Sequence, residues 1–454
     1  MTDTMLDPLA QRDVAHVIHP LTRHRQLDDT GPVIVIEGNG ATVTLEDGRT
    51  LVDGSAGLWN VNVGHGRSEL AEVARTQMER LAFSPTFGGF SHEPAIALAE
   101  RLSQLAPGDL SAAMFTSGGS EANETAFKLA RYYWLLNERP EKLIVLSHDR
   151  GYHGLSLAAG SATRLSQYHG DFGPNAPGFE QIPAPYPYRC SAGVPCDPDD
   201  CDVTSGRALA RRIEELGPEN VAAVIAEPVL GTGGVIVPPL GYLANVRQIC
   251  DQYEVLLIAD EVITGFGRTG RMFGVEHEDV IPDLMTFAKG VTSGYVPLGG
   301  VLVRSFIRQA LHSVPDDHPL MHGFTYSGHP VACVVALENI DIIEREQLVA
   351  QADNRGKYLA KRLQDLAVLP EVGDIRSRGL MAGVELVADQ ETRERFPAEL
   401  GRGGTVSREA RNHGLATRPL LDDILLLAPP LITSEEEIDR CVEALAISIE
   451  ATRP

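Results

Sequence analysis

Several features that are common in protein sequences are scarce or missing in this chain. It has 454 residues but only five lysines, and it contains no run of about 18 apolar residues. No basic segment followed by an apolar one opens the chain, so neither a membrane-spanning helix nor a signal peptide is visible. Its 62 acidic and 39 basic residues give a net charge of −23, which disfavours nucleic acid and anionic membranes as partners. We therefore expect a cytoplasmic protein.

The chain also lacks the paired Cys-x-x-Cys spacing of common zinc sites. Three of its six cysteines lie in one stretch rich in Pro, Gly and Asp, with five and four residues between them: Cys190, Cys196 and Cys201. This spacing favours reduced thiols on a surface loop over a structural zinc ion, and no metal site is expected. The other three fall in helical patterns and are expected to be small core residues: Cys250, Cys333 and Cys441.

Among the few lysines, Lys289 has an unusual position because it closes the apolar run 284–288 and precedes Gly290. Burial lowers the pKa of an amine because the charged form loses its hydration, and a neutral amine in a cleft can form a Schiff base with a carbonyl. A snorkelling lysine at a strand end is the alternative. The other four are expected at solvated positions, in helices or, for the last, in a turn: Lys128, Lys357, Lys361 and Lys142.

An acidic pair follows a second apolar run. Residues 255–259 end in Asp260 and Glu261, as expected where a buried parallel strand of an open α/β sheet places its ligands. An aspartate there could keep a pyridine nitrogen protonated, which is the pairing expected for pyridoxal phosphate beside a Schiff-base lysine. A helix cap or an ion pair with Arg268 is the alternative for Asp260.

A glycine-rich turn could supply the phosphate site. Residues 116–121 read Thr-Ser-Gly-Gly-Ser-Glu and stand between a predicted strand at 112–115 and a helical pattern that begins at Ala122. Backbone N–H groups and the helix dipole at such a turn attract anions. Taken alone, this turn is weak evidence, because similar sequences cap many helices.

Alternating helical and buried-strand patterns run from about residue 65 to 325 and predict a mostly parallel sheet covered by helices. The clearest strands are 143–146, 221–226, 255–259, 284–288 and 300–303.

The two ends of the chain differ from this central part. Short β-type runs at 33–36, 41–45 and 50–53 predict a meander. After Pro330 we expect a helix, strands at 380–386 and 424–427, and a terminal helix capped by Thr433 and Glu436. The predicted domains are 1–64, 65–325 and 326–454, with the first and third packed together as one small α+β domain.

These motifs, in this order, resemble the class III (ω-type) pyridoxal-phosphate aminotransferases from about Trp59 to the C-terminus. The matching stretches are 57–66, 117–123, 152–154, 227–228 with 231–234, 260–268, 288–290 and 325–330. The resemblance implies the α/β fold of PLP-dependent transferases of fold type I, pyridoxal phosphate as cofactor, and a homodimer or a dimer of dimers. One departure is Ser-Gly-Gly-Ser at 117–120, where members often have Asn-Ser-Gly-Ser, so one hydroxyl contact to the phosphate is missing.

The resemblance also assigns roles around the cofactor. Lys289 would form the Schiff base and move the proton, Asp260 would hold the pyridinium nitrogen, and Glu227 would support that side of the ring. Val262 and Tyr152 would cover the two ring faces. The phosphate would be bound by Gly119, Ser120 and, from the partner subunit, Thr325.

In the amine:pyruvate branch of the family, the resemblance matches Trp59 and Phe87 to the aromatic substrate pocket and Arg418 to a mobile arginine that binds carboxylates. Arg378 is the next candidate for that carboxylate. The implied reaction is ping-pong transfer of an amino group from an ω-amine or ω-amino acid of the β-alanine, taurine, diamine or aromatic amine type to a keto acid. Pyruvate is the expected acceptor, but the sequence does not decide between pyruvate and 2-oxoglutarate.

Two other functions share the same first step or the same fold. A class III aminomutase or dialkylglycine-type decarboxylase would use the same cofactor residues, and a non-catalytic PLP-binding protein would keep the fold without turnover. Surface loops set the choice of amine, so the sequence does not name the physiological donor.

Overall fold

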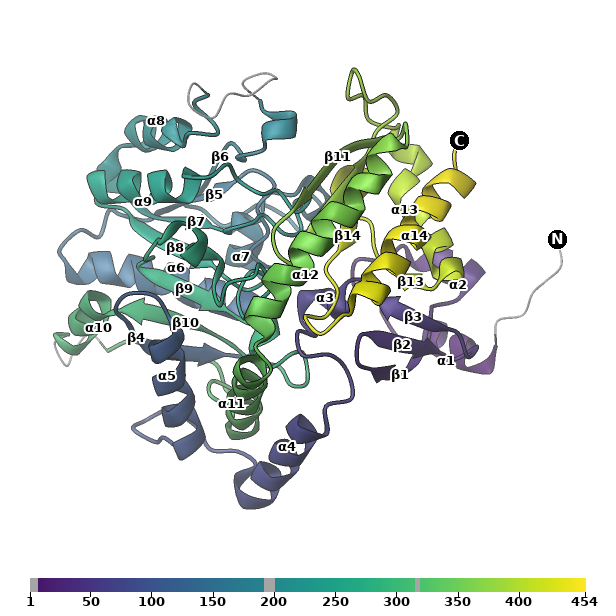
Figure 1. Cartoon of the computed structure of the whole chain (residues 1–454). Helices are drawn as coiled ribbons and strands as arrows, with labels where there is room; N and C mark the ends of the chain where they lie inside the picture. The colour runs from purple at the N-terminus through teal and green to yellow at the C-terminus, as the bar shows by residue number, and fades with distance from the viewer. Residues whose placement is uncertain (1–6, 192–200, 315–318) are drawn as a thin grey trace.

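A computed structural model describes residues 7–191, 201–314 and 319–454 (Figure 1). Its centre is a seven-stranded sheet of order β4-β10-β9-β8-β7-β5-β6. The strands are β4 (Leu110–Thr116), β5 (Ile144–His148), β6 (Phe179–Ile182), β7 (Val221–Ala226), β8 (Leu256–Asp260), β9 (Leu284–Phe287) and β10 (Gly299–Arg304). Only β10 runs antiparallel to its neighbours among these strands, so the predicted mostly parallel sheet is confirmed.

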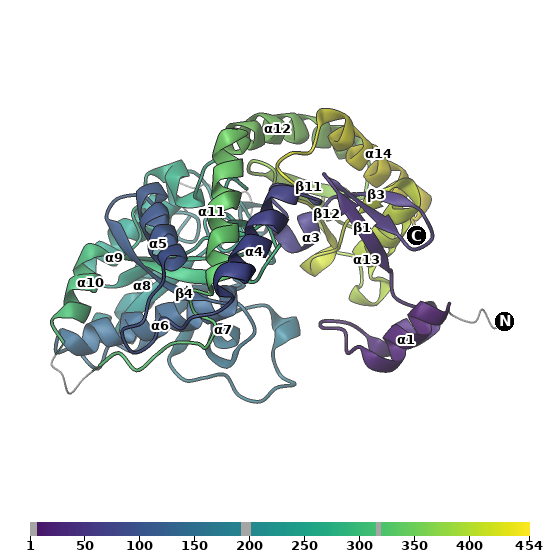
Figure 2. The same cartoon turned by 90° about the horizontal axis from the view of Figure 1, so that it is seen from below.

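Helices cover both faces of this sheet, as Figures 1 and 2 show. They include α5 (Glu93–Leu105), α6 (Gly119–Leu136), α7 (Leu157–Ala162), α8 (Arg207–Leu216), α9 (Tyr242–Gln252) and α10 (Ser305–His312). Helix α4 (Ser68–Leu81) packs against α11 (Pro330–Arg345) instead. Every residue of β7 and β8 is buried, which explains why these strands read as continuous apolar runs rather than alternating patterns.

Both ends of the chain contribute to one small sheet. It has the order β1-β2-β3-β13, and the meander β1 (Val35–Asn39), β2 (Thr42–Leu45) and β3 (Thr50–Asp53) is extended by the parallel strand β13 (Leu415–Ala416). The first strand, β1, starts at Val35, whereas the sequence pattern predicted a start at residue 33. Figure 1 shows the purple N-terminal strands beside the yellow C-terminal helix.

A third sheet and four long helices complete the C-terminal part. The sheet is antiparallel with β11 (Val372–Ser377), β12 (Ala382–Leu386) and β14 (Ile424–Leu427). The helices are α11 (Pro330–Arg345), α12 (Leu348–Leu363), α13 (Arg402–Ala410) and α14 (Glu435–Ala451), and short helices also flank the meander: α1 (Pro8–His16), α2 (His24–Thr30) and α3 (Ala56–Trp59).

The cap of the last helix lies one residue later than predicted. Ser434 and Glu437 form the capping box of α14, with the Glu437 N–H 3.2 Å from Ser434 Oγ and the Ser434 N–H 2.8 Å from Glu437 Oε2. Thr433 is buried, and its N–H donates to the Pro430 carbonyl, so it belongs to the preceding turn.

The prediction of a solvated Lys142 is wrong. Its side chain is fully buried, and Nζ donates to the carbonyls of Pro218 and Val221 at 2.7 and 2.9 Å. The ammonium also lies 4.6 Å from the ring centroid of Trp134, and burial lowers its pKa to about 8. Two carbonyls and a ring replace its hydration, so burial alone does not mark a catalytic lysine in this protein. The other three lysines expected in solvent are exposed: Lys128, Lys357 and Lys361.

The cysteine predictions have mixed outcomes. Cys190 and Cys201 are free thiols, as predicted, but they are buried with their sulfur atoms 3.3 Å apart, so the predicted surface position is wrong for this pair. Cys196 lies outside the described residues. The predicted core residues are confirmed as buried: Cys250, Cys333 and Cys441. Within the described ranges no group of His, Cys, Asp and Glu has a metal-binding arrangement, and no helix there has the length and apolar character needed to cross a membrane.

Candidate active site

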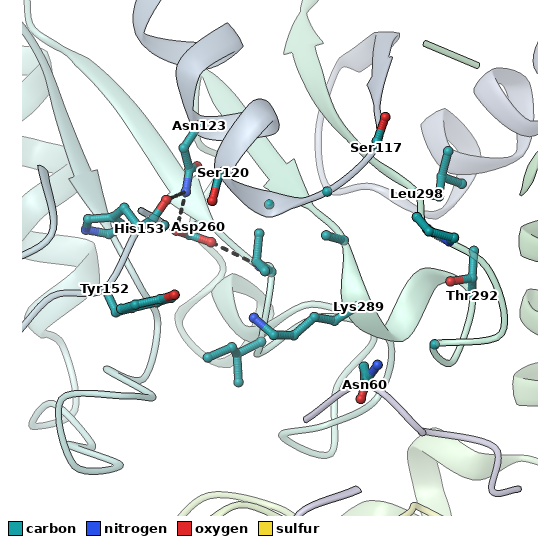
Figure 3. A pocket seen from close by; sticks show the side chains of 18 of the residues that line it. Asn60, Ser117, Ser120, Asn123, Tyr152, His153, Asp260, Lys289, Thr292 and Leu298 are labelled. Carbon is teal, nitrogen blue, oxygen red and sulfur yellow. Dashed lines mark hydrogen bonds and ion pairs between the residues drawn. The ribbon is translucent and has the colours of Figure 1, made fainter. Parts of the chain in front are cut away.

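A cavity of about 340 Å³ opens where β8 and β9 end and α6 begins (Figure 3). Because β8 and β9 are adjacent and parallel, with Asp260 opposite Thr286, their carboxyl ends deliver Asp260 and Lys289 to the same place. The cavity brings together seven of the residues singled out in the sequence: Gly119, Ser120, Tyr152, Glu227, Asp260, Val262 and Lys289.

Lys289 extends across the cavity toward Tyr152 and Asp260 (Figure 3). Its backbone adopts a left-handed conformation, with φ of 45°, which is uncommon for a lysine and typical of residues held in place at functional sites. Burial lowers the pKa of its amine, and Asp260 and Glu227 oppose this shift only in part. No hydrogen bond from Nζ to another described residue is present. An unengaged amine with a lowered pKa is therefore available in the cavity.

Asp260 is buried and held by three donors. Its Oδ2 accepts hydrogen bonds from His153 Nδ1 at 2.8 Å and Asn123 Nδ2 at 2.9 Å, and its Oδ1 accepts from the Val262 N–H at 3.1 Å. Burial by itself would raise the pKa of this carboxyl, but these donors, led by His153, hold the pKa below its ordinary value. Asp260 is thus kept as a carboxylate, ready for a cationic partner in the cavity.

Glu227 fixes two loops at the cavity wall. Its two carboxylate oxygens accept from the Tyr152 N–H at 2.9 Å and the Gly231 N–H at 2.8 Å. Burial raises its pKa to about 7, and the charge of Asp260 adds to that effect. Glu227 therefore places the Tyr152 ring beside the cavity through the backbone.

The N-terminus of α6 forms a cradle for an anion. This helix has 18 residues, and no side chain caps its first turn. A Cβ on Gly119 would come within 2.9 Å of Val262, so the glycine allows this turn to pack closely against β8's loop. Gly154 has no side chain, so the Ser120 hydroxyl can lie close to its backbone. A Cβ at this position would come within 2.3 Å of Ser120 Oγ. Free backbone donors at the end of a long helix suit a phosphate.

Arg418 and Trp59 lie together beside this cavity. The Arg418 guanidinium carbon is 4.9 Å from the Trp59 ring centroid, and no described acidic side chain pairs with it. Burial lowers the pKa of this guanidinium, while the hydroxyls of Tyr168 and Tyr152 act in the opposite direction. Arg418 is thus a cation near the cavity that rests on an aromatic ring rather than on a carboxylate.

Two predicted residues lie away from the cavity of this chain. Phe87 is 46% exposed and packs near Gly323, and Thr325 is exposed. Phe87 lines a separate hollow with residues of α5 and β4. Neither residue can contribute to this cavity within one chain in the conformation observed.

The alternative partners considered from sequence are not at the site. Arg268 donates to the carbonyls of Leu380 and Pro429 and to Asn62 Oδ1, and it makes no ion pair with Asp260. Arg378 does not line the cavity.

Sequence reasoning missed His153, Asn123 and Tyr168. His153 directly follows Tyr152, and Asn123 follows Gly119 by one helical turn, so both carried a positional signal. Tyr168, whose ring lies 5.6 Å from that of Tyr152, belongs to an irregular segment with no pattern to mark it.

The residues present fit pyridoxal phosphate at three separate points. A carboxylate held by His153 and Asn123 suits the protonated ring nitrogen, Lys289 suits the carbonyl carbon, and the first turn of α6 suits the phosphate. The buried atoms Asn123 Oδ1 and His153 Nε2 have no described hydrogen-bond partner, so each can still form a hydrogen bond beside Asp260.

Comparison with known proteins identifies the family of this chain. The profile of the family described as Aminotransferase class-III matches residues 25–449. The putrescine--pyruvate aminotransferase of Pseudomonas aeruginosa is 41% identical over 94% of this chain and 92% of its own. An (S)-enantioselective omega-transaminase from Thermomicrobium roseum superposes with a TM-score of 0.95 at 47% identity, and each chain is covered to 98%. The omega transaminase of Pseudomonas jessenii in complex with PMP gives a TM-score of 0.94 at 37% identity, again with 98% of each chain covered. The predicted fold type I is thereby confirmed.

Proposed function

Since this chain belongs to the class III aminotransferases, we propose that it moves an amino group from an ω-amine or ω-amino acid to a keto acid, preferably pyruvate, by a ping-pong mechanism. The observation that carries this proposal is the Arg418 guanidinium, which lies over Trp59 without a described acidic partner. A carboxylate-free amine can use the site while Arg418 rests on the ring. A keto acid can then recruit the same arginine to bind its carboxylate.

The cofactor residues have distinct tasks in this proposal. When bound, pyridoxal phosphate supplies an electron sink for the reacting carbon. Asp260, hydrogen-bonded by His153, would keep a proton on the ring nitrogen by its charge. Lys289 would move the proton at the reacting carbon, a role that its lowered pKa suits.

The remaining contacts orient the ring and the phosphate. Val262 and Tyr152 would hold the two faces of the cofactor ring, and Glu227 holds the Tyr152 backbone. Gly119 and Ser120 offer the phosphate backbone N–H groups and a hydroxyl.

Assembly and architecture complete the proposal. The active unit is a homodimer or a dimer of dimers in the cytoplasm, and Thr325 of the partner subunit reaches the phosphate. Phe87 would likewise serve a cavity only across a subunit interface, because it lies outside its own chain's cavity. We divide the chain into 1–64, 65–325 and 326–454, with the first and last parts sharing the β1-β2-β3-β13 sheet.

A donor and acceptor panel tests the function. β-Alanine, taurine, putrescine and an aromatic amine are each offered with pyruvate or 2-oxoglutarate, and alanine or glutamate is measured. Putrescine has priority because the Pseudomonas aeruginosa relative is named for it. Alanine formation from an ω-amine supports the proposal. Carbon dioxide release from an added 2,2-dialkylglycine would indicate a decarboxylase, an isomerised amine an aminomutase, and no turnover at all a non-catalytic protein.

A further inference from the structure

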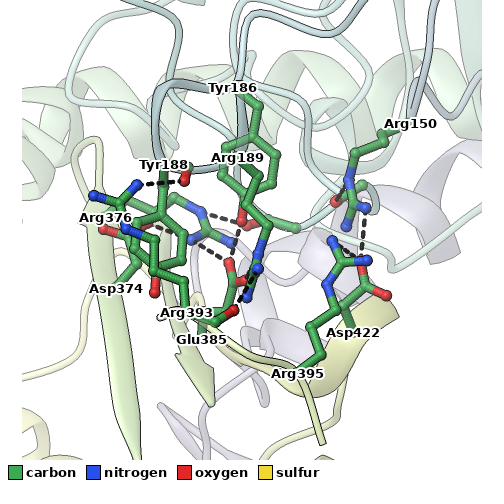
Figure 4. A network of polar contacts seen from close by, with 12 residues as sticks. Arg150, Tyr186, Tyr188, Arg189, Asp374, Arg376, Glu385, Arg393, Arg395 and Asp422 are labelled. Atoms are coloured by element: carbon green, nitrogen blue, oxygen red, sulfur yellow. Dashed lines mark hydrogen bonds and ion pairs between the residues drawn. The ribbon is translucent and has the colours of Figure 1, made fainter. Parts of the chain in front are cut away.

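A buried polar cluster joins the C-terminal strands to the loops that lead to the cavity (Figure 4). At its centre, the Glu385 carboxylate accepts from Arg189 Nε at 2.6 Å, from Arg376 Nη1 at 2.9 Å and from the Tyr186 hydroxyl. The Tyr186 ring lies between two guanidinium groups, 4.9 Å from that of Arg376 and 5.5 Å from that of Arg150. This packing leaves the cluster little freedom to move.

Arg150 connects this cluster to the cavity wall. It follows β5 in the loop that carries Tyr152, and its backbone has a left-handed φ of 64°. Its Nε donates to the Gly233 carbonyl at 2.9 Å, and its Nη1 donates to Asp422 Oδ2 at 2.7 Å. The side chains of this ion pair are only 12% and 17% exposed, so solvent screens the pair weakly.

Asp422 occupies the tip of a hairpin that has Arg418 at its base. The Leu426 N–H donates to the Arg418 carbonyl at 3.2 Å, and the Leu420 N–H donates to the Ile424 carbonyl at 2.7 Å. Asp422 itself has a left-handed φ of 61°, as a tight turn requires. Because the hairpin is short and hydrogen-bonded across, the position of its tip sets the position of its base.

We infer that the Arg150–Asp422 ion pair is a positioning contact for carboxylate recognition: it fixes the Arg418 hairpin against the loop that carries Tyr152. The pair links two segments 272 residues apart in sequence, the loop that carries Tyr152 and the hairpin that carries Arg418. Small displacements of a binding group from its productive position cost large factors in catalysis, so loosening this link weakens the grip of Arg418 on a carboxylate. The inference rests on the proposed function, because it takes Arg418 as the carboxylate ligand.

Binding can be measured without turnover by tryptophan fluorescence. The chain has two tryptophans, so Trp134→Phe leaves Trp59, under Arg418, as the only reporter. Propionate, which carries the carboxylate of pyruvate but no keto group, is titrated into this holoenzyme. In that background Asp422→Asn is expected to raise the apparent Kd for propionate about tenfold. This is the size of effect expected when one charge-assisted contact is weakened.

Arg395→Gln is the matched control. Arg395 pairs with the same Asp422 carboxylate at 3.0 Å, but its side chain is 44% exposed. Its removal is expected to change the Kd less than twofold. Equal effects of Asp422→Asn and Arg395→Gln, or no fluorescence response to propionate in the Trp134→Phe enzyme, would overturn the inference.

Steady-state kinetics with both tryptophans present provide a second readout. Asp422→Asn should raise the KM for pyruvate about tenfold and leave the amine half-reaction within twofold, and it should add nothing further in an Arg418→Ala background. Additive losses would show that Asp422 acts on the fold in general. If propionate binding depends on Asp422 but no amine reacts, the proposed function fails and the positioning contact stands. If turnover is normal and Asp422→Asn changes neither readout, the contact alone fails.

Discussion

The guanidinium of Arg418 lies 4.9 Å from the ring centroid of Trp59, and no described carboxylate neutralises it. Arg418 is half-buried, and a guanidinium withdrawn from water is normally paired, because an unpaired charge there destabilises the protein. An aromatic face compensates in part and lets the arginine leave when a better anion arrives. This arrangement suits a site that must accept an uncharged substituent and a carboxylate in turn.

Arg418→Ala should therefore affect only one half of the reaction. We expect the KM for pyruvate to rise roughly 100-fold, about 3 kcal/mol for a lost charge-assisted pair. The half-reaction with a carboxylate-free amine, followed by the absorbance of the bound cofactor, should change less than twofold. Arg378→Ala is the control, because Arg378 lies outside the cavity. Equal losses in both half-reactions would assign Arg418 a structural role.

Lys289 and Lys142 should give opposite phenotypes when they are replaced. Lys289→Ala is expected to abolish turnover while circular dichroism and melting stay near those of the wild type, because its amine has no described hydrogen-bond partner to lose. Lys142→Met removes two hydrogen bonds and the contact with Trp134, so we expect the unfolding free energy to fall by about 2–4 kcal/mol. The kcat of the folded Lys142→Met protein should be unchanged. Substantial transamination by Lys289→Ala would remove the central assignment.

Stability should fall as pH rises through about 7, because burial raises the pKa of Glu227 and of Glu261 to about 7. In the unfolded chain these groups titrate near pH 4.3. Each contribution is thus fully present below that pH and is lost as the pH rises through 7. For one such group the loss between pH 6 and pH 8 is about 1 kcal/mol.

Glu227→Gln should remove one of these two contributions. The difference in unfolding free energy between pH 6 and pH 8 is expected to shrink by about 1 kcal/mol, whatever the overall stability of the variant. Glu180→Gln, at a half-exposed ion pair with Arg212, should leave the difference unchanged. An unchanged difference in Glu227→Gln would show that this carboxyl is already ionised at pH 6.

Local patterns predicted the elements that build the site. The run before Asp260 and the run before Lys289 are apolar because β8 and β9 are buried on both faces, and parallel pairing brings their ends together. The composition of β10 carries no information about its direction, so its antiparallel pairing with β4 and β9 could not be predicted.

The remaining features depend on contacts between distant segments. Lys142 can be buried because the carbonyls of Pro218 and Val221, more than 70 residues away, accept hydrogen bonds from its ammonium group. Arg150 and Asp422 are 272 residues apart, and both are ordinary charged residues in loops. Residue type and spacing cannot reveal such partners, which only the folded chain brings together.

The assembly prediction concerns Thr325, which is exposed and does not line the cavity of its own chain. If it serves the partner's phosphate site, Lys289→Ala and Thr325→Trp each damage a different half of a shared site. Each homodimer should be inactive, the first for want of the amine and the second because a bulky side chain fills the phosphate position. In a heterodimer one of the two sites carries both defects and the other carries neither. Tagged heterodimers purified from a mixture should therefore recover up to about half of the wild-type activity per dimer, a value that follows from one intact site in two.

A mixture of Lys289→Ala with Asp260→Ala is the control, because both residues line the cavity of one chain and every site then lacks one of them. Verified Lys289→Ala/Thr325→Trp heterodimers that show no more activity than this control would mean that each site is built from a single chain.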